Sequence, residues 1–227
     1  MKMRFDASLE KNDLPSGERP GPAVKREVRI AILAVSGVAL FLVGRWTANI
    51  GQPAPVQTLV DNAPRPIGFV KVDEKTQGSW RGIYGAEGVA IANEKVELPA
   101  YAQVHFPRDT SFWIKSAPSE KRALQKTNDP VDRVASSWYS FSGFDIDIAF
   151  TDTRTHQVAL YILDWDSNLR KQKIQVTDVA TSNLLDERVA SAFTGGQYLV
   201  WNLKGHVNLK ITLVDGANAV VSGLFLN

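Results

Sequence analysis

The segment 164–168, with the sequence DWDSN, holds the residues best suited to chemistry. At the spacing of an extended strand, Asp164 and Asp166 project to the same side, and with Asn168 they offer the hard oxygen ligands that calcium prefers. The EF-hand pattern is absent, because Leu169 stands where that loop needs glycine and no glutamate falls at its closing position. The segment therefore predicts either a structural calcium site or a turn of solvated carboxylates.

Aromatic side chains beside turns are the second kind of candidate. A flat indole can cover the apolar face of a sugar ring while its N–H bonds a polar partner. Trp80, Tyr84 and Trp165 lie near turn residues and are the candidates for contact with a ligand or partner, with packing as the alternative. Trp138 and Trp201 lie within strand patterns, so we expect them in the core.

Enzymatic chemistry is not indicated. The chain has no cysteine, which excludes disulfides, thiol catalysis and cysteine-bound metals. There is no G-x-S-x-G elbow, and His105, His156 and His206 stand singly in the sequence. We expect these histidines to be structural, and the protein to have neither catalytic residues nor a cofactor.

The glycines at 82, 85 and 88 invite comparison with a phosphate-binding loop. Such a loop needs a strand before it and a helix after it, so that helix amides point at the phosphate. No helical pattern follows here. The glycines instead predict positive φ angles in a crossing loop.

The elements around these residues show the period-two alternation of half-buried strands. It is clearest in residues 144–150 (FDIDIAF) and 207–213 (VNLKITL). Further short β-branched or aromatic runs are separated by glycine, proline and asparagine turns, and only Ser119–Lys126 has a helical pattern. The pattern predicts a mainly β fold over 69–227, an antiparallel β-sandwich of jelly-roll type.

Several blocks of this region, in order, resemble a known kind of domain. They are residues 76–88 (TQGSWRGIYGAEG), 122–126 (RALQK), 156–166 (HQVALYILDWD), 193–202 (FTGGQYLVWN) and 218–225 (NAVVSGLF). The blocks are similar to a small β-sandwich, galactose-binding-like or carbohydrate-module-like, that is appended to secreted and surface proteins of environmental bacteria. The resemblance implies the fold and supplies no catalytic residues, since the family has no established activity.

Before the sandwich, the sequence divides into three segments. Residues 1–29 form a basic, Pro/Gly-rich tail, and residues 51–68 form a proline-rich linker. Between them, an uncharged run over 30–43 predicts a transmembrane helix over 30–50. Arg29 and Arg45 would reach the two interfaces, where Trp46 would also lie.

Charge predicts the orientation of this helix. Residues 1–29 carry seven basic and five acidic groups, whereas residues 46–227 carry 18 basic and 19 acidic groups. By the positive-inside rule, the N-terminus is cytoplasmic and the domain lies on the far side of a bacterial inner membrane, in the periplasm or outside the cell. The near-neutral domain argues against nucleic acid as a partner.

Two functions fit this organisation. The first is a non-catalytic accessory subunit, with the bilayer and the membrane proteins of a larger complex, such as a respiratory or photosynthetic one, as partners. The alternative is a membrane-tethered module that binds glycans through exposed aromatic side chains. A subunit needs a broad contact face, whereas a glycan module needs an aromatic groove with polar groups beside it.

Overall fold

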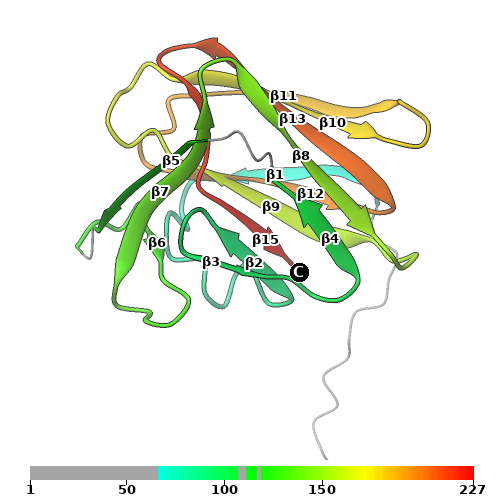
Figure 1. Cartoon of the computed structure of the whole chain (residues 1–227), viewed down its shortest axis with the longest axis horizontal. Helices are drawn as coiled ribbons and strands as arrows, with labels where there is room; N and C mark the ends of the chain where they lie inside the picture. Colours follow the sequence, from blue (N-terminus) through cyan, green and yellow to red (C-terminus); the bar gives the residue numbers. More distant parts are fainter. Residues whose placement is uncertain (1–65, 107–110, 117–118) are drawn as a thin grey trace, which may run out of the picture. The chain divides into compact units, whose positions relative to one another are not determined.

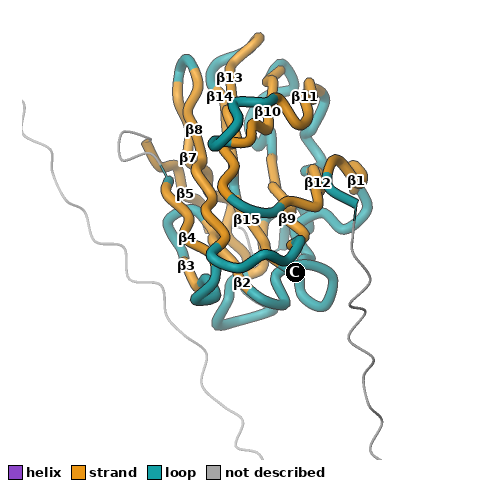
Figure 2. The backbone as a smooth tube through the Cα atoms, turned by 90° about the vertical axis from the view of Figure 1, so that its right-hand side faces the viewer, coloured by secondary structure: helices purple, strands orange, loops and turns teal. Residues whose placement is uncertain are grey.

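The computed structural model describes residues 66–106, the backbone of 111–116, and residues 119–227. The predicted tail, the transmembrane helix over 30–50 with Arg29, Arg45 and Trp46, and the linker up to residue 65 lie outside the described residues. Within the described part of the chain, no helix is long and apolar enough to span a membrane. All regular structure in this part is β-strand (Figure 2), which confirms the mainly β prediction.

The first two sheets are antiparallel and form the two layers of a sandwich (Figure 1). Sheet A runs in the order β1 (Gly68–Asp73), β12 (Gln197–Leu203), β9 (His156–Ile162), β15 (Gly223–Leu226), β2 (Gly88–Ile91) and β3 (Lys95–Glu97). Sheet B runs in the order β11 (Leu184–Ser191), β10 (Lys171–Asp178), β13 (His206–Asp215), β8 (Gly143–Phe150) and β4 (Ala102–His105). The predicted antiparallel sandwich is therefore confirmed.

A third, smaller sheet was not predicted. Sheet C consists of β14 (Ala219–Val221), β7 (Arg133–Ser140) and β5 (Ser111–Ser116), with β6 (Leu124–Gln125) also paired to β7. Two chain connections join it to the sandwich: β7 leads directly into β8 of sheet B, and β14 continues through Ser222 into β15 of sheet A. Sheet C thereby forms a wall that links the two layers, and β7 provides one side of the pocket described below.

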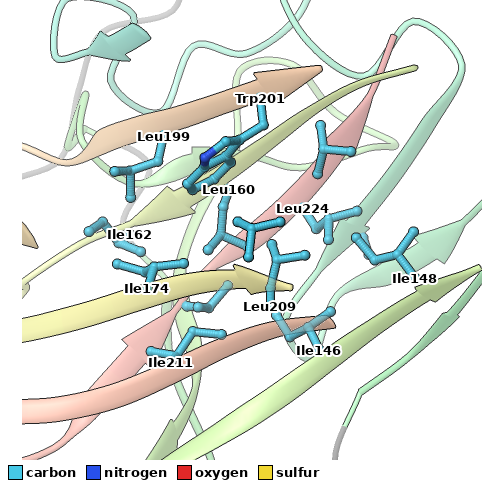
Figure 3. Packing of buried hydrophobic residues seen from close by; sticks show 14 of the residues in the cluster. Ile146, Ile148, Leu160, Ile162, Ile174, Leu199, Trp201, Leu209, Ile211 and Leu224 are labelled. Carbon is cyan, nitrogen blue, oxygen red and sulfur yellow. The ribbon is translucent and has the colours of Figure 1, made fainter. Parts of the chain in front are cut away.

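The main core lies between sheets A and B. Ile146, Ile148, Ile174, Leu209 and Ile211 of sheet B face the large apolar residues of sheet A (Figure 3). Those residues are Leu160, Ile162, Leu199, Trp201 and Leu224. Trp201 is fully buried and Trp138 is 4% exposed, so both tryptophans expected in the core lie there.

Sheet A is covered on its other face as well. The residues that alternate with the main core, among them Tyr161, Tyr198 and Phe225, pack into a second cluster with Trp80 and Tyr84. Every residue of β9 except Gln157, and every residue of β12, is consequently buried. The loop 74–87 thus serves as a lid of packed side chains over sheet A.

The prediction of a helix over Ser119–Lys126 is wrong. The segment instead forms a turn followed by β6, because its backbone bonds to a distant segment: the Gly78 amide donates to the Lys121 carbonyl and the Gln125 amide donates to the Gly78 carbonyl, at 2.9 and 3.0 Å. A Cβ on Gly78 would lie 1.8 Å from the Ala123 carbonyl oxygen, so this close approach requires glycine. Gly82 and Gly85 have the predicted positive φ, +76° each, whereas Gly88 does not, because it is the first residue of β2.

Candidate functional site

The loop between β9 and β10 is organised around the buried carboxylate of Asp164. Its Oδ1 accepts from the Ser167 amide at 3.1 Å and from the Ser167 hydroxyl at 2.9 Å, which makes a tight side-chain-closed turn. Its Oδ2 accepts from the Arg170 amide at 3.2 Å. Asp164 is 1% exposed, so these donors replace the water that the carboxylate loses on burial.

The guanidinium of Arg170 bridges the two aspartates of this loop. Its Nη1 donates to Asp164 and, at 2.6 Å, to Asp166, while its Nε donates to Asn218 at 2.9 Å. The Arg170 side chain is 8% exposed, whereas Asp166 is 60% exposed. A buried cation therefore joins an inner carboxylate to one that faces solvent.

This bridge bears on the predicted calcium site. The Arg170 cation already bonds both Asp164 and Asp166, and Asn168 is exposed, with no hydrogen bond to either carboxylate. In the described part of the chain, no group of three or more His, Cys, Asp or Glu side chains is placed to hold a metal ion. The calcium site stays a prediction, and the bridge disfavours it because a metal ion would have to displace the guanidinium.

The same loop forms one side of a pocket of about 190 Å³. Sheet C and the residues flanking β14 form the rest of the wall. The polar lining residues are Ser136, Ser137, Asp166, Arg170, Asn218 and Ser222, and the aromatic ones are Tyr139, Phe141 and Trp165. Aromatic and hydrogen-bonding side chains are thus combined in one concave site, as in sites for small ligands.

The aromatic residues of the pocket differ in their exposure. Phe141 is 75% exposed, and its ring meets that of Tyr139 edge to face, with centroids 5.9 Å apart. Trp165 is half-buried, and the Arg122 guanidinium lies over its ring at 4.3 Å from the centroid. Arg122 also donates to the carbonyls of Trp165 and Thr194, so the indole is held in a fixed place.

Trp80 and Tyr84 lie elsewhere, and their contact with a ligand stays a prediction that their burial disfavours. Trp80 is 6% exposed and its indole N–H donates to the Gln125 carbonyl at 2.8 Å. Tyr84 is 2% exposed and stacks on Tyr198, with centroids 4.3 Å apart. A sugar platform must present a ring face, and these two rings are packed against protein.

Tyr84 and the loop around it also perturb a carboxylate. Burial alone would raise the pKa of Asp73, but hydrogen bonds from the side chains of Thr76 and Tyr84 and the amides of Thr76 and Lys75 outweigh it. Together they lower the pKa of Asp73 from 3.8 to about 2. The ionised carboxylate is therefore part of what fixes the lid on sheet A.

Two of the histidines are held by aspartates, as expected of structural residues. His156 is buried, bonds Asp152 at 2.8 Å through Nε2, and stacks on Tyr101 and Phe150. His206 bonds Asp147 at 2.8 Å. Strand pairing also brings the exposed His105 to 3.8 Å from Asp147, a neighbourhood that the sequence alone did not indicate.

Comparisons with known proteins add little to this geometry. No protein family matches the chain, and no curated protein does. A family 35 carbohydrate-binding module from Clostridium thermocellum aligns over 56% of this chain and 98% of its own, at 13% identity and a TM-score of 0.31. TmCBM61, solved with β-1,4-galactotriose, aligns over 56% of this chain and 85% of its own, at 11% identity and a TM-score of 0.28. Both are modules of the kind that the sequence resembles, but scores this low say nothing about a ligand.

Proposed function

We propose that this protein is a non-catalytic glycan-binding module, held at the membrane by residues 30–50. The observation that carries the proposal is the pocket, in which Tyr139, Phe141 and Trp165 lie beside Asp166, Arg170 and Asn218. Aromatic rings cover the apolar faces of sugar rings, and the polar side chains bond their hydroxyls. Phe141 is the informative residue, because a large apolar ring that is 75% exposed contributes little to the core.

Affinity electrophoresis of the full chain in mild detergent, through gels containing single soluble polysaccharides, tests this function. We expect at least one polysaccharide to retard the wild-type protein, and Phe141→Ala and Trp165→Ala to reduce the retardation. Val131→Ala is the matched control, because Val131 is 77% exposed and does not line the pocket. A protein that no polysaccharide retards, or a Phe141→Ala variant retarded like the wild type, would contradict the proposal.

The accessory-subunit function remains a second candidate, favoured by a different surface. The edge strands β1 and β11, one from each sheet, carry the half-exposed apolar residues Val70, Val72, Leu184 and Val189, and Ile83 of the lid is 51% exposed. Such residues suit contact with another protein. Stoichiometric membrane proteins that copurify with the tagged chain in mild detergent, and are lost when Val72 and Val189 are changed to lysine, would support it.

A further inference from the structure

The charged residues of the pocket indicate which sugars it can bind. This inference rests on the proposed glycan-binding function. Arg170 is the one guanidinium that lines the pocket among the described residues, and an exposed arginine would attract an acidic sugar. Here, however, its Nη1 bonds two carboxylates and its Nε bonds Asn218. The cation is thus already neutralised by the protein.

The carboxylates outnumber the cation at this place. Asp164 and Asp166 share Arg170, which leaves one negative charge in excess, and Asp166 is the member that is 60% exposed at the pocket. Arg122, which lies over the Trp165 ring and does not line the pocket, is itself 3.4 Å from Glu120. A ligand carboxylate would therefore be repelled by the excess negative charge. Both arginines, Arg170 and Arg122, already have carboxylate partners, so neither is left unpaired to attract it.

The remaining polar groups suit hydroxyls. Asp166 accepts hydrogen bonds, and the amide of Asn218, whose Oδ1 is occupied by Arg170, has N–H groups to donate. Ser137 lies on the same face of β7 as Tyr139 at the pocket, and its hydroxyl can both donate and accept. A sugar hydroxyl both donates and accepts, so it can satisfy groups of either kind.

The size of the pocket limits the ligand to one ring. A volume of about 190 Å³ is below the ~300–1,000 Å³ of sites for drug-sized molecules. We infer that the pocket binds one uncharged pyranose unit of a glycan and discriminates against uronic acids, with the exposed carboxylate of Asp166 as the residue that sets this selectivity.

Matched sugar pairs test the inference on the full chain in detergent. Titration calorimetry at neutral pH would compare the methyl glycosides of glucose, galactose and mannose with those of the corresponding uronic acids, which differ only in a carboxylate at C6. We expect at least one neutral glycoside to bind ten-fold or more tightly than its uronate. Asp166→Asn should narrow that ratio at least three-fold, because it removes the exposed charge, and Asp145→Asn, on the outer face of sheet B, should leave it unchanged.

The outcomes separate this inference from the function on which it rests. A uronate that binds as tightly as its neutral counterpart, or an unchanged ratio in Asp166→Asn, would overturn the selectivity and leave glycan binding standing. A chain that binds none of these sugars and is retarded by no polysaccharide would overturn the function, and the selectivity with it.

Discussion

The phenol of Tyr84 donates a 2.7 Å hydrogen bond to Oδ2 of Asp73, which ties the lid over sheet A to the end of β1. Thr76 donates to the same oxygen at 2.7 Å, and the amides of Lys75 and Thr76 donate to Oδ1. A carboxylate that accepts four hydrogen bonds is stabilised in its ionised form. The stability of the lid should therefore depend on pH.

Asp73→Asn should lower the free energy of unfolding by about 2 kcal/mol at neutral pH. This is the stabilisation that corresponds to lowering the pKa of Asp73 from 3.8 to about 2 on folding. Because the pKa is lowered in the folded state, this stability is present above pH 4 and is lost as the pH falls towards 2. Denaturant titrations followed by tryptophan fluorescence should show the wild type and variant converging in that range. The exposed neighbour provides the control: Glu74→Gln makes the same change of charge and should not alter the pH dependence.

The ion pairs of Arg170 should differ in their contribution to stability. Asp164→Ala leaves a buried guanidinium with one of its two carboxylate partners and should cost about 3 kcal/mol or more. Asp166→Ala removes a carboxylate that is 60% exposed and should cost less than about 1 kcal/mol. If the two variants lose the same stability in thermal or denaturant unfolding, the buried Asp164 contributes no more to stability than the exposed Asp166, and the prediction is wrong.

Removal of calcium should not change the thermal stability of the domain. Since Arg170 already bonds Asp164 and Asp166, the loop does not need a divalent ion to neutralise its carboxylates. The unfolding midpoint should be the same with a calcium chelator and with millimolar calcium. A midpoint that rises with calcium would restore the metal site over Asp164, Asp166 and Asn168.

Two glycines with similar φ angles should respond differently to alanine. At Gly196, with φ of +78°, a Cβ would lie 1.7 Å from the Tyr161 hydroxyl, which is buried and donates to the Arg122 carbonyl at 2.6 Å. At Gly82, with φ of +76°, a Cβ would meet nothing within 4 Å. Gly82→Ala should cost about 1 kcal/mol from the backbone alone, and Gly196→Ala about 3 kcal/mol or more, because it also displaces Tyr161. Denaturant titrations would measure both changes in stability. Similar losses of stability would show that the Tyr161 side chain can move aside at little cost.

The sequence correctly predicted those strands in which apolar and polar residues alternate because one face is buried and the other is exposed. Residues 144–150 alternate because one face of β8 meets the core and the other meets solvent. The helical pattern of residues 119–126 misled because their backbone bonds go to Gly78, some forty positions away, and periodicity carries no information about such a partner. Sheet C escaped prediction for the same reason, since its pairing joins β14 to β7 across about eighty residues.

The site was predicted only where its residues are neighbours in sequence. Trp165, predicted to contact a ligand, and Asp166, predicted to bind calcium, both line the pocket. Tyr139, Phe141 and Asn218 reach it from other elements, and only the strand order brings them there. Trp80 and Tyr84 looked equally exposed, but the lid turns them inward onto Phe225 and Tyr198.

The place of β15 constrains how the domain is made. This strand, Gly223–Leu226, lies between β9 and β2 in the middle of sheet A, although it is the furthest along the sequence. At synthesis rates of about 5–20 residues per second, β1 waits roughly 8–30 s on the ribosome before residue 226 is joined. Until then the two halves of sheet A have no strand between them. β9 and β2 lack this neighbour throughout that interval, so sheet A can be completed only after residue 226 has been added.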